Sequence, residues 1–378
     1  RNPELRALAS DTDGARARIR QARIWQNPEI EFEHENFGGT GHFSGSAAAE
    51  TTLSIAQSLP LGGDISQRRN LAELEVQLAD WDYHAQRLET VLGVTERFVA
   101  ALVAERRLEL VKRELELAKA TKRLTETRVE TGDASPAQLT RLVVPIVTAE
   151  LNVARAQRLQ VAAFQGLSLT WADRTVSFER ISGDLGAIMP PPSAESLVQH
   201  ITGNPGVARW AVEISARVAE RRLARAEAVP DLVGRFGIRR HRESGDDSLV
   251  VGLSLPLPLF DRGQAKIQSA RAGEAAAQER QLAAVLQVEG LLNNTYAALA
   301  NAYDEAVVLR DRALPAAEQA YRDTQLAFKE GKLRFLDVLD AQRTLFALQA
   351  RHLRALENYH LAAAAAESLI GRSLAGLH

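Results

Sequence analysis

The chain contains two copies of one unit, and this repeat limits the folds that it can adopt. Asn2-Pro3-Glu4-Leu5 is echoed by Asn204-Pro205-Gly206-Val207, and Asn27-Pro28-Glu29-Ile30 by Val229-Pro230-Asp231-Leu232. Both pairs lie 202 residues apart (205 − 3 and 230 − 28). Each copy is therefore expected to fold into the same supersecondary unit. We predict a division that follows the repeats, residues 1–200 and 201–378.

Each repeat is expected to begin with a helix, over about residues 4–25 and 206–227, because an Asn-Pro pair is typical of a helix start. Two strands should follow each helix. We place them at 28–37 and 49–60 in the first repeat, and at 230–241 and 248–258 in the second. A tilted strand needs about ten residues to cross a bilayer, and these segments have that length.

Alternation along these strands predicts one apolar and one small or polar face. A barrel with lipid outside and water inside requires this pattern, although an ordinary sheet on a soluble core shows it too. The residues predicted to face lipid are Leu53, Ile55, Leu249, Val251, Leu253 and Leu255.

A very long helical pattern follows each strand pair, over residues 64–130 and 264–330, and Pro315 is its only proline. A helix of this length spans about 100 Å, too long for a compact domain. Glycine turns then start second helices that run back to about residues 168 and 371. We expect two antiparallel coiled-coil hairpins, 64–168 and 264–371.

Composition excludes several classes of function. The chain has no cysteine and a formal net charge of −2, which excludes disulfides and thiolate metal sites and suggests no nucleic-acid partner. No apolar run reaches the roughly 18 residues of a membrane-spanning helix, so a membrane role would need β-strands. We expect no enzyme and no cofactor, because phosphate-loop, nucleophile and dinucleotide motifs are missing. The histidines lack metal-site spacing, so no metal site is predicted.

Four strands cannot close a barrel, and an open sheet edge cannot lie in lipid. Several chains must combine, and three chains with twelve strands are the simplest closure. The predicted fold is mainly α with a membrane β-barrel: coiled-coil hairpins form a trimeric α-helical tunnel continuous with a 12-stranded barrel, four strands per chain.

Three stretches of the sequence resemble the outer-membrane efflux factors, of which TolC is the type member. They are NPEIEFEHENFGG at 27–39, ETTLSIAQSLPLGG at 50–63 and FLDVLDAQ at 335–342. The first two look most like the branch that serves heavy-metal pumps of the cobalt-zinc-cadmium and copper-silver type. The resemblance implies a homotrimeric channel in the outer membrane of a Gram-negative bacterium, with a periplasmic helical extension and an equatorial segment at 170–199.

The resemblance also implies partners: a periplasmic adaptor (membrane fusion protein) and an inner-membrane RND pump that feed a passive duct for heavy-metal cations. The adaptor would contact the hairpin turns, at Gly132, Asp133, Ser135, Gly331, Lys332 and Leu333.

The same mapping assigns Asp337 and Asp340 to the periplasmic entrance. Their spacing places both on one helix face, so three chains would project six carboxylates into the mouth. A solvated helix face, or the preference for acids in a first helical turn, is the alternative. Some family members have an arginine in the turn, whereas this chain has Leu333, with Lys332 and Arg334 beside it. We include Arg334 among the entrance residues. The contacts that close the entrance in those family members are not transferred to this chain.

An acidic stripe runs along the first strand, at Glu29, Glu31, Glu33 and Glu35. We expect these side chains to face the lumen, partly neutralised by Arg235 and Arg239 of the second repeat. A solvated wall is favoured over a specific metal site, because a duct must release what enters it.

Two alternatives remain open from the sequence. Within the channel class, the chain would be an outer-membrane duct for multidrug efflux or type I secretion. In another class, it would be a periplasmic coiled-coil adaptor or scaffold, and contact of the apolar strand face with lipid would separate the two classes.

Overall fold

The computed structural model describes residues 2–377 and divides into two units. The hairpin unit contains residues 2–6, 84–207 and 285–377, and the sheet unit contains Ala7–Tyr83 and Ala208–Ala284. Each unit therefore combines segments of both sequence repeats.

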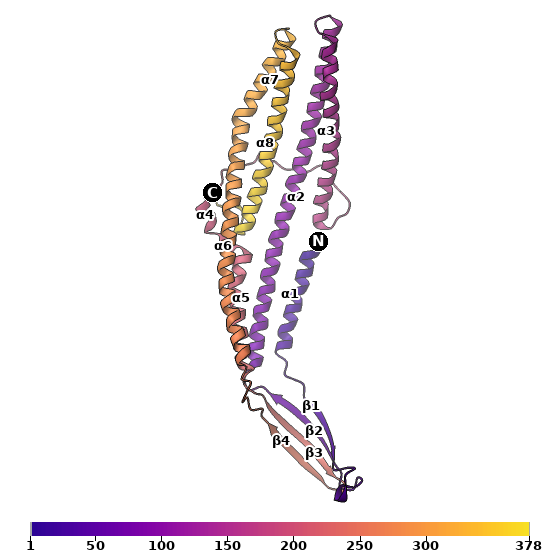
Figure 1. Ribbon diagram of the computed structural model, residues 1–378, viewed down its shortest axis with the longest axis vertical. Coiled ribbons are helices and arrows are strands. Elements are labelled where there is room, and N and C mark those ends of the chain that lie inside the picture. The colour runs from indigo at the N-terminus through magenta and orange to yellow at the C-terminus, as the bar shows by residue number, and fades with distance from the viewer. Residues whose placement is uncertain (1, 378) are drawn as a thin grey trace. The chain divides into compact units, whose positions relative to one another are not determined.

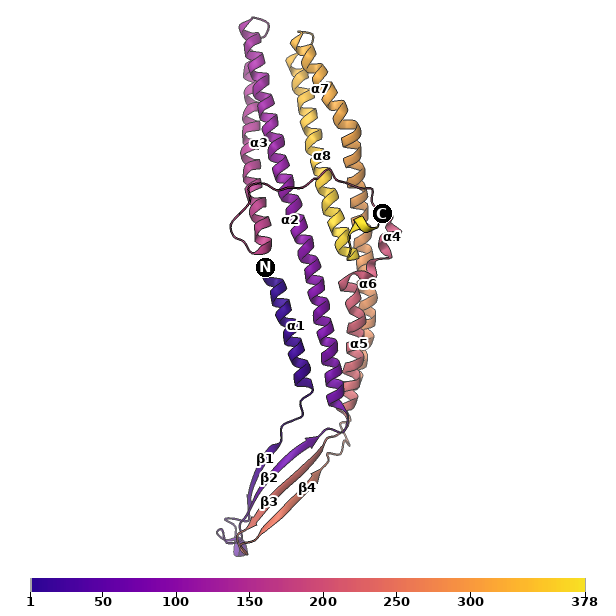
Figure 2. The same ribbon diagram turned by 180° about the vertical axis from the view of Figure 1, so that it is seen from behind.

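Four antiparallel strands form the sheet of the sheet unit, in the order β1-β2-β3-β4 (Figures 1 and 2). The strands are β1 Glu29–Glu35, β2 Glu50–Leu59, β3 Leu232–His241 and β4 Asp247–Ser254. The expected length of about ten residues is confirmed for β2 and β3, and it is wrong for β1 and β4, which have 7 and 8 residues. β1 stops before Asn36, whose φ is 60°, and β4 stops before Pro256, which cannot donate to a ladder.

Helices of the sheet unit come from both repeats. They are α1 (Pro3–Ala22) from Ala7 on, α5 (Pro205–Ala226) from Ala208 on, and the first parts of α2 (Asp64–Glu130) and α6 (Gln264–Val308). Small side chains let helices pack closely. The buried alanines of these segments are Ala15, Ala72, Ala216, Ala219, Ala224, Ala226 and Ala277.

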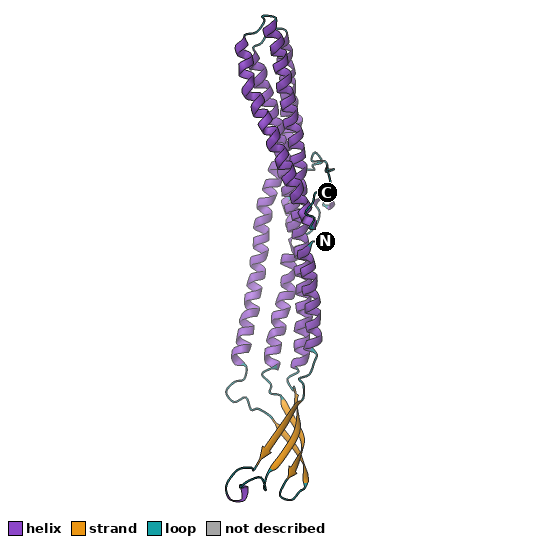
Figure 3. Cartoon of the chain, turned by 90° about the vertical axis from the view of Figure 1, so that its right-hand side faces the viewer, coloured by secondary structure: helices purple, strands orange, loops and turns teal. Residues whose placement is uncertain are grey.

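Two long hairpins, without the first parts of α2 and α6, build the hairpin unit (Figures 1 and 3). The first consists of α2 and α3 (Pro136–Ser168), so the predicted helix 64–130 is confirmed. The second consists of α6, a π-helical segment (Leu309–Ala313), α7 (Leu314–Lys329) and α8 (Phe335–Ile370); a short α4 (Ala194–Val198) precedes α5. Within residues 2–377, no helix is both long and apolar enough to cross a bilayer.

The predicted helical stretch over 264–330 contains a π-helical segment, which was not predicted from the sequence. Here the N–H of Leu314 donates to the carbonyl of Leu309, five residues earlier. Pro315 follows at once and has no N–H to donate to the carbonyl of Asp311. The wider turn therefore lies where the proline would interrupt an α-helical ladder.

Buried side chains join the two hairpins of the hairpin unit. Leu142 of α3 is 1% exposed and lies in one cluster with Tyr321 and Phe328 of α7 and Val338 of α8. A second cluster joins α6 to α8 around Leu299, which is 0% exposed. The first cluster therefore joins the two hairpins, and the second joins the two arms of one hairpin. Both contacts are made by apolar side chains.

The linker formed by residues 172–193 runs across both hairpins (Figure 2). Leu185 packs in one cluster with Val99 of α2 and Leu356 of α8. The hydroxyl of Tyr359 donates to the carbonyl of Met189 at 2.9 Å and accepts from its N–H at 3.0 Å. The linker thus holds α2 and α8 together.

Candidate functional site

One face of the sheet is apolar and exposed in the single chain. Register places the apolar residues in two rows, Ile30–Ile55–Phe236–Val251 and Phe32–Leu53–Ile238–Leu249. Val251 is 73% exposed and Leu253, on the same face, is 75% exposed. Five of the six residues predicted to face lipid lie on this face, and Leu255 follows the end of β4. This surface needs a partner, because large side chains of this kind are rarely left in water as one patch.

The opposite face is polar and carries a chain of ion pairs. Arg235 reaches two glutamates of β1: its Nη2 lies 2.6 Å from Glu31 Oε2 and its Nη1 3.2 Å from Glu33 Oε1. Arg239 joins Glu35, at 3.2 Å, to Glu50, at 3.0 Å. The structure therefore brings the predicted arginines and three of the four stripe glutamates together. Glu29 lies on the same face at the start of β1.

Sequence reasoning missed Glu50 and His241 as members of this polar face. Arg239 Nε donates to Thr52 Oγ1 at 2.8 Å, and His241 Nδ1 lies 3.1 Å from Glu50 Oε1. Glu50 is directly opposite both Glu35 and His241 across the ladders. The alternation Glu50-Thr51-Thr52-Leu53 was a usable signal, but the neighbours follow only from the register of the strands.

The two hairpin turns have the same backbone geometry. Gly132 has φ 83° and Gly331 has φ 76°, a conformation that favours glycine. In each turn the next N–H donates back to a helix carbonyl, Asp133 to Arg128 at 2.8 Å and Lys332 to Ala327 at 2.9 Å. The predicted adaptor-contact residues of both turns are exposed: Gly132, Asp133, Ser135, Gly331, Lys332 and Leu333. Ser135 Oγ also caps α3 by accepting from Ala137 N–H at 3.3 Å.

Arg128 connects the ends of the two hairpins. Its Nη1 donates to the carbonyl of Phe328 at 2.9 Å, and its guanidinium carbon lies 4.6 Å from the centre of the Phe328 ring. The turns of the hairpin unit are therefore held side by side by a polar contact in addition to the apolar cluster around Leu142.

The two aspartates predicted at the entrance occupy different environments. Asp337 lies in the first turn of α8, where its Oδ2 accepts the N–H of Arg334 at 2.9 Å. The Arg334 guanidinium lies 3.6 Å from the same carboxylate. Asp340 is exposed on the next turn. Asp337 thus caps the start of α8, in agreement with the alternative that acids are preferred in a first helical turn.

Replacing Asp337 with alanine should remove this cap and lower the free energy of unfolding by about 1 kcal/mol. Asp340→Ala removes an equal charge without removing a cap and should change stability much less. Thermal unfolding of the two variants compares them directly. Equal losses in both would contradict the capping role.

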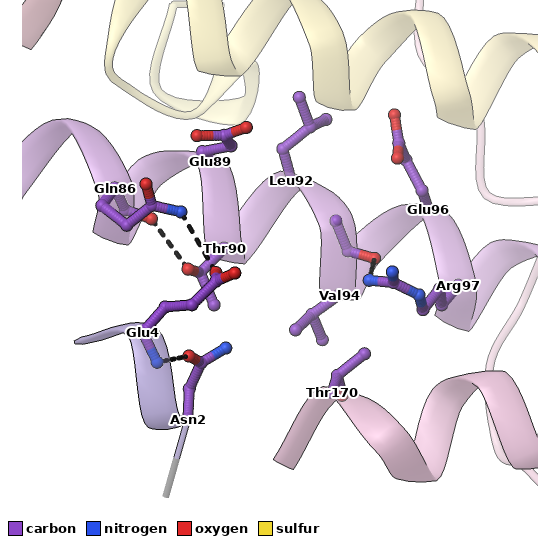
Figure 4. A pocket seen from close by; sticks show the side chains of 11 residues that line it. Asn2, Glu4, Gln86, Glu89, Thr90, Leu92, Val94, Glu96, Arg97 and Thr170 are labelled. Atoms are coloured by element: carbon purple, nitrogen blue, oxygen red, sulfur yellow. Dashed lines mark hydrogen bonds between the residues drawn. The ribbon is translucent and has the colours of Figure 1, made fainter. Parts of the chain in front are cut away.

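A separate hollow of about 320 Å³ lies where the start of α1 meets α2 (Figure 4). Gln86 Nε2 donates to Glu4 Oε2 at 3.4 Å, and the N–H of Glu4 donates to Asn2 Oδ1 at 2.9 Å. Its other charged lining residues are Glu89, Glu96 and Arg97. None of the site residues predicted from the sequence lines this hollow.

Comparison with protein families decides the class of the chain. The family described as "Outer membrane efflux protein" matches residues 1–172 and 197–372. The chain belongs to this family. Both repeats lie within the match, which argues against a periplasmic adaptor or scaffold. As a member of this family, the protein is located in the outer membrane.

Two relatives of this efflux protein are named for resistance to metals. The cobalt-zinc-cadmium resistance protein CzcC of Cupriavidus metallidurans is 32% identical over 371 residues, which cover 98% of this chain and 87% of that protein. The nickel-cobalt-cadmium resistance protein NccC of Alcaligenes xylosoxydans xylosoxydans is 26% identical over 284 residues, covering 74% of this chain and 63% of that protein.

A solved channel has the same fold. The open-state outer membrane channel MtrE of Neisseria gonorrhoeae superposes with a TM-score of 0.80 at 18% identity, over 99% of this chain and 87% of that one. The predicted fold class, with a helical tunnel and a barrel to which each chain contributes four strands, is confirmed at the level of the fold.

Proposed function

We propose that this efflux protein is the outer-membrane duct of a tripartite system that exports heavy-metal cations. The observation that carries the proposal is the 32% identity to a cobalt-zinc-cadmium resistance protein over 98% of the chain. The polar sheet face supports it, because its glutamates outnumber its arginines and a wall of net negative charge favours cations.

Three copies are proposed to form the channel. The sheet has two unpaired edges, β1 and β4, and these strands run antiparallel to each other. The β4 edge of one copy can therefore pair with the β1 edge of the next, and three copies close twelve strands into a barrel. In this trimer the row containing Val251 faces lipid and the glutamate stripe faces the lumen.

The hairpin turns are proposed as the docking surface for a periplasmic adaptor, which connects the duct to an inner-membrane RND pump. The turns support this role because they are exposed at one end of the hairpin unit (Figure 1). Asp337, Asp340 and Arg334 would then lie at the entrance, where carboxylates from three copies attract cations. The duct itself is passive, so the pump supplies the energy.

Cellular metal content tests the proposed function. A native strain with and without the gene is challenged with zinc, cobalt, cadmium, copper or silver, and metals are measured by elemental mass spectrometry. We expect several-fold accumulation of a subset of these metals on deletion, restored by the intact gene. Unchanged metals together with retained dyes or antibiotics would overturn the metal assignment and favour a multidrug duct.

A further inference from the structure

Three potential metal ligands form one row across the polar face of the sheet. Glu35 of β1 lies opposite Glu50 of β2, and Glu50 lies opposite His241 of β3. Directly opposite side chains begin about 4.5–5.5 Å apart, close enough for one ion to be shared. Carboxylate and imidazole groups are ligands of zinc and cobalt. By composition alone, this row would be a metal site.

Arg239 already occupies this row from the neighbouring position on β3. Its Nη1 and Nη2 atoms each contact a carboxylate, of Glu50 at 3.0 Å and of Glu35 at 3.2 Å. Its Nε donates to Thr52 Oγ1 at 2.8 Å, so all three nitrogens are engaged and the guanidinium is fixed. Among residues 2–377, no group of three or more His, Asp or Glu side chains is arranged to hold a metal ion. The two carboxylates of the row are engaged with Arg239 instead.

Arg235 lies on the same face of β3 and in the same way contacts two carboxylates, those of Glu31 and Glu33. Gly237 lies between the two arginines in sequence, and a Cβ there would lie 2.6 Å from Ser54 Cβ and 2.7 Å from the Leu53 carbonyl. No side chain fits at this position. β3 therefore places no side chain between the two arginines on this face.

We propose that Arg239, with Arg235, is a resident counter-cation that prevents the acidic wall from retaining metal ions. Five glutamates and two arginines share the face, which leaves a formal charge of −3 per chain (2 − 5) with His241 neutral. The wall still attracts cations, but Glu35 and Glu50 are not free to chelate one. The role of these arginines in transport rests on the proposed function. Their effect on metal binding by the glutamates does not.

Metal binding by the purified, detergent-solubilised protein tests the proposal, with Co²⁺ as the probe because its visible absorption reports its ligands. Wild-type protein should show no absorption from a His-ligated ion. Arg239→Gln should bind one Co²⁺ per chain with such a band, and Glu50→Gln in the same background should abolish it. Arg239→Lys keeps the charge and should behave as wild type.

Two results would overturn the proposal. One is a folded Arg239→Gln variant that binds no more Co²⁺ than wild type does. The other is wild-type protein that already shows the His-linked band, a result that needs no variant to fold. If deletion of the gene causes no metal accumulation, only the proposed function is contradicted, because the Co²⁺ titration does not depend on transport.

Discussion

Val251→Arg is expected to abolish assembly of the protein in the outer membrane. Val251 is 73% exposed and lies in the apolar row with Ile30, Ile55 and Phe236. An arginine near the bilayer midplane costs about 2–4 kcal/mol in a barrel, and the proposed trimer would contain three of them. Outer-membrane fractions of the variant are run on gels with and without heating. The band of the assembled protein, expected in the unheated sample, should be missing.

Val250→Arg is the matched control, because neighbouring residues of a strand point to opposite faces. Val250 lies opposite Gly237 on the polar face, where an arginine remains in water in the proposed barrel. This variant should assemble. Normal assembly of both variants would show that the row containing Val251 does not face lipid, and would contradict the proposed orientation of the sheet.

Leu299→Ala should lower the free energy of unfolding by about 3–5 kcal/mol, since it leaves a cavity in a packed core. Leu299 is 0% exposed, in the cluster that joins α6 to α8 with Leu292 and Tyr359. Thermal unfolding of the solubilised protein, followed by circular dichroism at helical wavelengths, measures the change.

Leu299→Met preserves most of the volume and should cost less than about 1.5 kcal/mol. The difference between the two variants isolates the cavity from other effects of changing this residue. An equally small loss in both would mean that the contact between α6 and α8 does not limit the stability of the hairpin unit.

The hairpins were predictable because their signals are local. Gly132 and Gly331 mark the turns, and the absence of proline from 64–130 predicted one continuous helix, as the structure has it. The π-helical segment was not predicted, although Pro315 marked its position. A proline signals a disturbed ladder, but whether the helix kinks, ends or widens depends on packing that sequence alone does not give.

The polar face was predictable only in part, for a related reason. Alternation placed four glutamates of β1 together and two arginines of β3 together. Which arginine meets which glutamate depends on the register of β2 between them, and that register brings Glu50 and His241 into the same row. Strand partners are non-local, so single-strand patterns could not reveal the row.

The division of the chain has a consequence for its biogenesis. The hairpin unit needs residues 84–207 together with 285–377, and the sheet unit needs Ala7–Tyr83 together with Ala208–Ala284. Neither unit can finish folding until the second repeat has emerged from synthesis and export, and contacts so distant in sequence form slowly. Until residues 208–284 arrive, β1 and β2 lack β3 and β4 as sheet partners, so the nascent protein should depend on chaperones that bind such apolar segments.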